Sequence, residues 1–338
     1  MFPCPPPQYG GSEVVVWDLA NSLAQMGHKV VLFAPEGSQV PNNGFLIECP
    51  PPELKVQTDW LQAERRMFDY YWDYLKDWAG VIHGHGWFGF EYLAKTKNPQ
   101  LKVVHSHHGG LNLEFWKRSP PPFKLNMVAI SDWMVKVYAS QGFTAKRVYN
   151  GINLDRYPFK KRKGERFLFL SRISKIKAPH LAIEVAKKAN VPLDVVGATN
   201  FVDDPSYVEQ VRGLCDGEQI RFVGEVSHED KLRYLQNAKA LLVPSSWGEP
   251  FGLHVVESMS VGTPVISLRD GGIVETIDNG VTGFLCQDTD EMVKQIKRVE
   301  LIKPRKCREW VEKNFSREIM ASNYIQRFND ILYENKEW

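Results

Sequence analysis

Residues 245–266 read SSWGEPFGLHVVESMSVGTPVI. An apolar strand pattern precedes them, and they continue as a Gly/Pro loop, a short helical pattern and a Gly-Thr-Pro turn into a further apolar strand. We expect Glu249 before the helix, at the strand end, and Glu257 about two turns along the helix. This order of elements predicts a parallel α/β unit, in which ligands bind at the carboxyl ends of the strands.

The same alternation of apolar runs and helical segments extends along the whole chain. Because 338 residues exceed what one hydrophobic core usually organises, two α/β domains are expected. The turn at Asn150-Gly151 and the basic run at 160–164 indicate the linker. We predict an amino-terminal domain over residues 1–155, completed by a C-terminal helix at 317–338, and a second domain over residues 156–316.

The apolar runs predict the strands of both domains, and two helical segments stand out from the rest. The segment 60–78 predicts an amphipathic helix with surplus aromatic residues, which either pack on a sheet or form a surface for an acceptor or a lipid. A last helix at 317–333 is expected to return to the first domain. The predicted strands are 29–33, 45–48, 81–83, 102–105, 127–130 and 147–149, then 167–170, 193–196, 220–223, 240–243, 264–267 and 283–285.

The composition excludes several classes of protein. With 42 Lys and Arg against 40 Asp and Glu, the formal net charge is only +2, which provides no general field for nucleic acid. Five scattered cysteines suit reduced thiols better than a disulfide framework or a zinc ribbon. No apolar run approaches a membrane span, and the start lacks the pattern of a signal peptide. We expect a cytoplasmic protein, with peripheral contact at the inner membrane face as an option.

Two further loops offer groups that bind anions. The Gly10-Gly11 pair stands just before a helical pattern, where glycines let the backbone approach a phosphate and helix amides attract it. A plain turn with Ser12 as N-cap is the alternative. Arg172 and Lys177 follow an apolar strand, and they could hold a diphosphate through the guanidinium fork and a point charge. A solvated basic loop is the alternative there.

The opening stretch itself adds two kinds of ligand-binding group. The backbone amides of Phe251, Gly252 and Leu253 would meet a phosphate between them. The carboxylates of Glu249 and Glu257 suit sugar and ribose, because an ionised carboxylate accepts hydrogen bonds from two adjacent hydroxyl groups.

This stretch closely resembles the Glu, seven residues, Glu signature of the retaining glycosyltransferases of family four, the glycosyl transferases group 1. The resemblance implies the GT-B fold, an α/β architecture of two Rossmann-like, doubly wound domains that face a central cleft. Ala178 stands where the family usually has Gly after its diphosphate-binding Lys. Further matches in the family's order are Gly10-Gly11, 150–153, Arg172 with Lys177, Gly271-Gly272, Glu275 and 280–284.

The resemblance also implies a role for each matched residue. Glu249 would touch the transferred sugar and Glu257 the ribose, while Val223 and Gly224 would lie beside the nucleobase. His108 aligns best with the family's sugar-contacting His, and His107 is close enough to leave the register open. The implied catalytic residues are His108, Arg172, Lys177 and Glu249, and the implied donor-binding residues are Gly10, Gly11, Val223, Gly224, Phe251, Gly252, Leu253 and Glu257.

For the activity, the resemblance implies transfer of a hexose from a nucleoside diphosphate sugar, UDP- or GDP-linked, to an acceptor hydroxyl. The acceptor could be a glycan, a lipid-linked sugar or a small molecule. Retention of configuration is implied, and no metal or other cofactor is expected because Arg172 and Lys177 would replace a metal. The oligomeric state stays open.

Two other functions fit some of the same residues. A nucleotide-sugar epimerase of GT-B type, or a non-catalytic binder, would share the donor groups. A metal-dependent hydrolase could use His83, His85, His105 and His107, because alternation along a strand puts both members of each pair on one face.

The amino terminus departs from the family pattern. Family members begin with a β-strand before the Gly-Gly loop, whereas only Met1-Phe2-Pro3 precedes a Pro-rich run here. Either the coding start was drawn late or the first domain is built without this strand.

Overall fold

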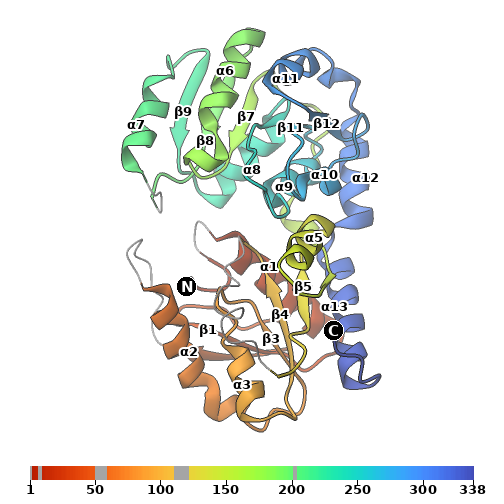
Figure 1. Cartoon of the computed structure of the whole chain (residues 1–338). Helices are drawn as coiled ribbons and strands as arrows, with labels where there is room; N and C mark the ends of the chain where they lie inside the picture. The colour runs from red at the N-terminus through yellow and green to blue at the C-terminus, as the bar shows by residue number, and fades with distance from the viewer. Residues whose placement is uncertain (1, 7–9, 50–58, 110–121, 201–203) are drawn as a thin grey trace. The chain divides into compact units, whose positions relative to one another are not determined.

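The computed structural model describes residues 2–6, 10–49, 59–109, 122–200 and 204–338 (Figure 1). The chain forms two compact units. Unit 1 consists of Met1–Gly151 and Arg317–Trp338, and unit 2 consists of Ile152–Ser316. The division therefore lies close to the expected boundary after residue 155.

Unit 2 contains a six-stranded parallel sheet in the order β12-β11-β10-β7-β8-β9. Its strands are near-continuous apolar runs, as parallel strands covered on both faces require; all four residues of β7, Phe-Leu-Phe-Leu, are buried. The strands are β7 (Phe167–Leu170), β8 (Leu193–Val196), β9 (Ile220–Gly224), β10 (Leu241–Val243), β11 (Val265–Leu268) and β12 (Gly283–Cys286). The helices are α6 (Pro179–Ala189), α7 (Pro205–Gly213), α8 (His228–Asn237), α9 (Leu253–Ser260), α10 (Ile273–Thr276), α11 (Thr289–Ile296) and α12 (Pro304–Asn314).

Unit 1 contains a four-stranded parallel sheet in the order β3-β4-β5-β6 and a separate parallel pair, β1-β2. Residues 2–6, the described segment before Gly10, form no strand. The strands are β1 (Val31–Pro35), β2 (Phe45–Cys49), β3 (Val81–Gly84), β4 (Lys102–His107), β5 (Met127–Ala129) and β6 (Ala145–Arg147). The helices are α1 (Gly11–Gln25), α2 (Trp60–Leu75), α3 (Glu91–Lys97), α5 (Asp132–Ser140) and α13 (Arg317–Leu332).

The predicted fold class, an α/β protein with parallel sheets, is confirmed, and a strand lies at or beside each of the twelve predicted positions. The strand expected at 147–149 is the least accurate, because β6 covers Ala145–Arg147. The three residues of β5 pair with the three residues of β6, and this pairing places the strand at Ala145–Arg147. No helix in the described part of the chain has the length and apolar character needed to span a membrane.

The aromatic segment at 60–78 forms α2, and one face of it is buried. Phe68, Tyr71 and Leu75 belong to a hydrophobic cluster that also includes Ile82 of β3. Tyr70 and Tyr74 stay exposed, at 46% and 51%. The packing role is therefore observed for the buried face, and the acceptor or lipid surface stays a prediction for the exposed one.

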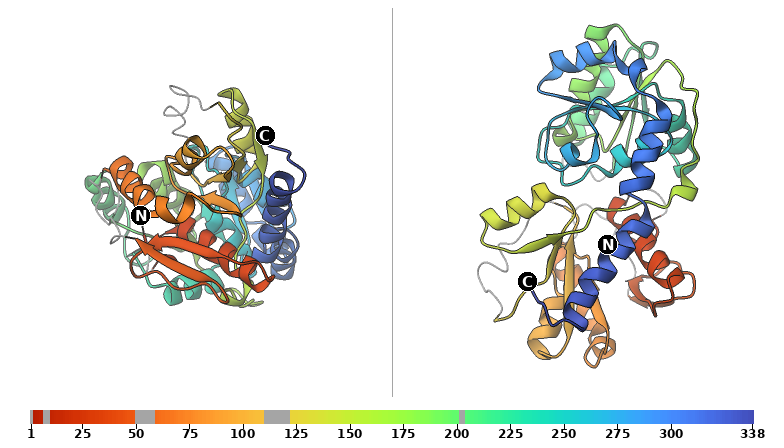
Figure 2. Two further views of the ribbon diagram at one scale, coloured as in Figure 1. Left: turned by 90° about the horizontal axis from the view of Figure 1, so that it is seen from below. Right: turned by 90° about the vertical axis from the view of Figure 1, so that its right-hand side faces the viewer.

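The last helix, α13, belongs to unit 1, where it packs against α1 and β4 (Figure 2). After it, Trp338 is held beside β5. The Trp338 indole donates to the Met127 carbonyl at 2.7 Å, and its backbone exchanges hydrogen bonds with Asn126. The Lys146 ammonium lies 4.1 Å from the indole centroid. These contacts attach the tail to the central strands of unit 1.

We predict that Trp338→Ala destabilises unit 1 by about 3 kcal/mol, because it removes a buried indole together with its hydrogen bond. Urea unfolding would measure the change. Tyr333→Ala, on the same tail but at a residue that is 82% exposed, is the matched control and should unfold like the wild type. Equal stability of the two variants would show that the tail contacts contribute nothing.

Candidate active site

The strand order of unit 2 reverses direction between β7 and β10, which are neighbours in the sheet. In a doubly wound sheet, ligands bind outside the carboxyl ends of the strands at such a switch point. The loop after β7 carries Arg172 and Lys177, and the loop after β10 carries Glu249. The fold therefore brings these sequence-predicted residues to one edge of one sheet.

Lys177 and Glu249 form an ion pair at this edge, with side chains only 14% and 11% exposed. The Trp247 indole donates to the same carboxylate oxygen, Oε2, at 3.0 Å, and the Lys177 ammonium lies 4.7 Å from the Trp247 ring centroid. Burial alone would raise the pKa of Glu249, but the charge of Lys177 holds this pKa below its usual value. Both groups are therefore charged, and each neutralises the other.

The loop that carries Glu249 is fixed by its backbone. The Asp270 carboxylate accepts hydrogen bonds from the amides of Gly248 and Glu249 at 2.9 to 3.0 Å. Gly271 has φ +50°, and a Cβ there would lie 2.2 Å from the Glu249 carbonyl oxygen. Only glycine fits this close approach, which explains Gly271 in physical terms.

The amino terminus of α9 is open for an anion. Gly252 caps the helix with φ 85°. Within the described residues, the amides of Gly252, Leu253 and His254 donate no hydrogen bond. Phe251 is buried and packs edge-on against Phe315. Several amides and the positive end of the helix dipole thus meet at the edge where Lys177 lies.

Glu257 is a buried carboxylate with two donors on a single oxygen. Tyr157 donates to Oε1 at 2.6 Å and Lys231 at 2.8 Å. In the described part of the chain, Oε2 accepts no hydrogen bond. Burial alone would raise the pKa of Glu257, but Lys231 and the two hydrogen bonds hold it below its usual value. Oε2 is therefore an ionised acceptor without a protein donor.

Sequence reasoning missed several residues of this site. Lys231 lies on α8 and Tyr157 lies 100 residues before Glu257, so no local pattern pairs them. Trp247 was quoted without a role. His254 was quoted too, and it stands in the first turn of α9, where burial lowers the pKa of its ring to about 4. Its place inside the Glu249 to Glu257 segment was the available signal.

Val223, Gly224 and Ala178 are the remaining residues of unit 2 that the sequence analysis singled out. Val223 and Gly224 end β9, two strands from β7 along the sheet, and Gly224 has φ +81°. Ala178, the departure from the family pattern, adopts φ +52°. Glycine takes this left-handed conformation without steric cost, whereas alanine pays about 1 kcal/mol.

The other predicted residues belong to unit 1. Gly10 caps α1, and a Cβ on it would lie 2.8 Å from Pro6 and 2.9 Å from a Glu13 carboxylate oxygen, so the close fit requires glycine. Gly11 begins the helix. Tyr9, which precedes this loop, and Gly110, which follows the histidine segment, lie outside the described residues.

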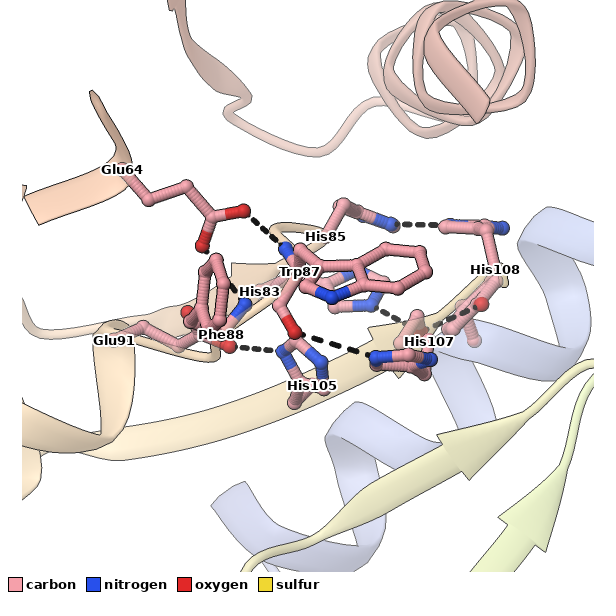
Figure 3. Close-up of polar contacts among 11 residues, drawn as sticks. Glu64, His83, His85, Trp87, Phe88, Glu91, His105, His107 and His108 are labelled. Carbon is pink, nitrogen blue, oxygen red and sulfur yellow. Dashed lines mark hydrogen bonds and ion pairs between the residues drawn. The ribbon is translucent and has the colours of Figure 1, made fainter. Parts of the chain in front are cut away.

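Five histidines gather where β3 and β4 end, and they divide into two groups (Figure 3). In the first group, His83 bonds the Ser106 hydroxyl at 2.7 Å and His85 Nδ1 lies 2.9 Å from His108 Nε2. In the second, His105 pairs with Glu91, and the His107 ring contacts the carbonyl oxygens of Trp87 and Gly109.

The strand register explains this division and corrects the four-histidine hypothesis. His83 stands beside Val104, and Gly84 stands beside His105, so the His83/His85 pair and the His105/His107 pair point to opposite faces of the sheet. Alternation along each strand correctly predicts a common face for the two members of each pair, but it does not predict which face of the sheet each pair occupies. In the described residues, no group of three or more His, Cys, Asp or Glu is arranged to hold a metal ion.

The structure also distinguishes His107 from His108. Both nitrogens of His107 face carbonyl oxygens, whereas His108 Nδ1 is buried and, among the described residues, has no partner at close hydrogen-bonding geometry. Asn150 Oδ1, also buried and without such a partner, belongs to a side chain that neighbours the His108 ring. The two histidines thus differ in their surroundings: His107 faces backbone carbonyl groups, and His108 faces His85 and Asn150.

Comparison with known proteins gives two family matches. Residues 153–317 match the model described as glycosyl transferases group 1. Residues 9–156 match the model described as glycosyltransferase family 4. The two matches follow one another and together reach from residue 9 to residue 317.

Relatives and solved structures are similar over most of the chain. The N-acetyl-alpha-D-glucosaminyl L-malate synthase of Bacillus anthracis is 25% identical, over 98% of this chain and 96% of its own. The glycogen synthase of Mycobacterium tuberculosis is 25% identical, over 85% and 81%. The structure of Anabaena HepE with UDP and glucose has a TM-score of 0.73 at 15% identity, over 95% and 96%. Sucrose-phosphate synthase from Thermosynechococcus elongatus has a TM-score of 0.76 at 19% identity, over 96% and 94%.

We predict that Lys231→Met lowers the free energy of unfolding by about 3 kcal/mol, because it leaves the buried Glu257 carboxylate without a cation. Urea unfolding at neutral pH would measure this. Adding Glu257→Gln to Lys231→Met should recover most of the loss, since the remaining charge is removed. No recovery in the double variant would show that the ion pair is not the cause.

We also predict an acid instability of unit 1. Burial, followed by the charge of His105, lowers the pKa of His107 to about 4, against 6.5 for the unfolded chain. The folded state therefore binds fewer protons, and stability that is present above pH 6.5 is lost as the pH falls towards 4, by about 3 kcal/mol. Urea unfolding of His107→Gln should depend less on pH in this window. The exposed His28→Gln is the control, and an equal slope in both variants would contradict the assignment.

Proposed function

This chain belongs to the glycosyltransferases of group 1, or family 4, and has the GT-B fold, and we propose that it transfers a hexose from a nucleoside diphosphate sugar to an acceptor hydroxyl with retention of configuration. The observation that carries the proposal is the arrangement at the switch point of unit 2. There the Lys177–Glu249 pair, open amides of α9 and the Glu257 carboxylate meet at one sheet edge. These are a cation and amides for phosphate, and carboxylates for hydroxyl groups.

For the donor, we favour UDP or GDP as the nucleotide. Solved structures of HepE, which has the same fold, contain UDP and UDP-glucose. Val223 and Gly224 at the end of β9 would contact the base largely through their backbone. Glu257 Oε2 would accept hydrogen bonds from the ribose hydroxyls, because Oε1 already has its two donors.

For the acceptor, we propose a hydroxyl group on a glycan, a lipid-linked sugar or a small molecule. The relatives' names span a glucosaminyl malate synthase, glycogen synthases and inositol phosphate glycosyltransferases. Such different acceptors on one fold fit the rule that function depends on the site rather than the fold.

For the chemical step, we propose reaction on one face of the sugar. The bond from the anomeric carbon to the diphosphate oxygen breaks, and the acceptor oxygen forms its bond on the same face. The acceptor proton passes to the departing diphosphate, so no protein carboxylate has to attack. Arg172, Lys177 and the amides at 251–253 would stabilise the leaving charge, and these cations would make a metal cofactor unnecessary.

Glu249 and His108 would hold the transferred sugar. Glu249 has one carboxylate oxygen engaged by Lys177 and Trp247, and the other is available for a sugar hydroxyl. In the described residues, His108 Nδ1 and Asn150 Oδ1 have no hydrogen-bond partner besides the contact between their own side chains, and a hydroxyl group could accept from one and donate to the other. Burial of such atoms is costly unless a ligand satisfies them.

We predict that substitution of Glu257 impairs nucleotide binding, whereas substitution of Glu249 impairs turnover. Glu257→Gln should weaken free UDP or GDP and the corresponding nucleotide sugar alike, as lost uniform binding. Glu249→Gln should cut turnover strongly, yet bind the free nucleotide roughly fivefold more tightly, because Lys177 is released from its competing carboxylate for the diphosphate. Calorimetry with free nucleotide and kinetics with nucleotide sugar would measure both effects.

The exposed Glu209→Gln is the matched control and should behave as the wild type. Identical defects in the two glutamate variants would refute their separate roles. A panel of nucleotide sugars with and without acceptors tests the reaction itself: transfer requires an acceptor, conversion without one would indicate an epimerase, and a shift in melting temperature alone would indicate a binder. Activity should persist in EDTA, and loss that added metal reverses would overturn the metal-independent mechanism.

A further inference from the structure

His85 and His108 form a hydrogen bond between two imidazoles. His85 follows β3 directly, and His108 follows β4. His85 Nδ1 lies 2.9 Å from His108 Nε2, and the two rings are nearly parallel, with 18° between their planes (Figure 3). The bond joins the ends of two neighbouring strands.

A hydrogen bond between two ring nitrogens needs one proton and one lone pair. Burial lowers the pKa of both rings, to about 3 for His108, so both are neutral at pH 7. Each ring then carries one N–H, and the bond can run in either of two directions. If His85 donates, the proton of His108 is on Nδ1; if His108 donates, Nδ1 carries a lone pair.

The surroundings of His108 Nδ1 favour the first direction. The Asn150 side chain and the His108 ring interact as hydrogen-bond partners, and neither Asn150 Oδ1 nor His108 Nδ1 has another partner in the described residues. An acceptor beside Nδ1 favours a proton on Nδ1, because two facing lone pairs would repel and leave both atoms unsatisfied. A proton on Nδ1 leaves Nε2 as the acceptor for His85.

We propose that His85 is a positioning residue, which donates from Nδ1 to His108 Nε2 and thereby keeps the proton of His108 on Nδ1, where Asn150 Oδ1 and a hydroxyl oxygen of the ligand are its acceptors. The direction of the hydrogen bond rests on the contacts of the two rings and on their neutrality. Only its consequence for turnover rests on the proposed function, in which His108 binds the transferred sugar. A histidine that binds a metal often has its tautomer fixed by a hydrogen bond to its other ring nitrogen. Here the hydrogen-bond partner is another histidine.

Nuclear magnetic resonance of ¹⁵N-labelled protein measures the tautomer directly. In long-range ¹H–¹⁵N spectra at pH 7, the His108 signals, assigned by their loss in His108→Gln, should show a protonated Nδ1 and an unprotonated Nε2. Finding the proton on Nε2 would overturn the proposal. This measurement uses the wild-type chain and so does not depend on whether a variant folds.

Two variants of equal size test the consequence. His85→Asn places an amide donor where Nδ1 was, and should keep the tautomer and the turnover of the wild type. His85→Asp places an acceptor there, and should move the proton of His108 to Nε2 and lower kcat by roughly tenfold or more, with free UDP or GDP affinity unchanged.

The outcomes separate the two proposals. Reversal of the tautomer in His85→Asp without any loss of kcat would refute the positioning role. An unchanged tautomer in His85→Asp would refute the hydrogen bond as its cause. If the wild type turns over no nucleotide sugar, the proposed function fails, while the spectra still decide the direction of the bond. A purely structural role would lower the melting temperature of both variants and leave the tautomer and kcat of the folded protein alone.

Discussion

Two buried carboxylates, each kept ionised by one lysine, are the constraint on which the strand-end loops of unit 2 depend. An isolated charge could not remain in this interior, so Glu249 requires Lys177 and Glu257 requires Lys231. The pairs fix the loop after β7 against the loop after β10, and α8 against α9. The Asp270 carboxylate accepts a hydrogen bond from the Glu249 amide and so holds the backbone of the same loop. Each pair leaves one carboxylate oxygen without its lysine, and a ligand can use that oxygen.

Unit 1 satisfies its buried polar groups in a different way. Its strand ends carry neutral imidazoles, joined to one another or to hydroxyl and carbonyl groups: His83 to Ser106 and onward to Tyr324, and His85 to His108. Neutral hydrogen-bonded groups avoid the desolvation cost of ions, but each must find a donor or an acceptor. Within the described residues, His108 Nδ1 and Asn150 Oδ1 have only the contact between their own two side chains. Lysine-paired carboxylates at the strand ends of unit 2 and hydrogen-bonded imidazoles at those of unit 1 are thus two different ways to satisfy buried polar groups.

Much of this arrangement could be predicted from the sequence, because strands and loops are local. Apolar runs located the strands, and the Glu249 to Glu257 segment located the switch point, since strand, loop and helix follow one another there. The partners of the carboxylates could not be predicted. Tyr157 and Lys231 reach Glu257 through the fold, over 100 and 26 residues of sequence. The division of unit 1 into two sheets was also beyond reach, because hydrophobic pattern gives strands but not their pairing.

The histidines show that the register between two strands, which the sequence does not give, can decide which side chains meet. Alternation within a strand is a property of the sequence, so His83 with His85, and His105 with His107, were correctly placed on common faces of their own strands. Which faces the two strands share depends on the register, and a shift by one residue exchanges every neighbour. The observed register puts His83 beside Val104, so its face continues to Ser106 and then to His108, while His105 and His107 turn to Glu91 and Trp87. A four-histidine cluster and a hydrogen-bonded pair of imidazoles thus differ by one residue in the register of one strand.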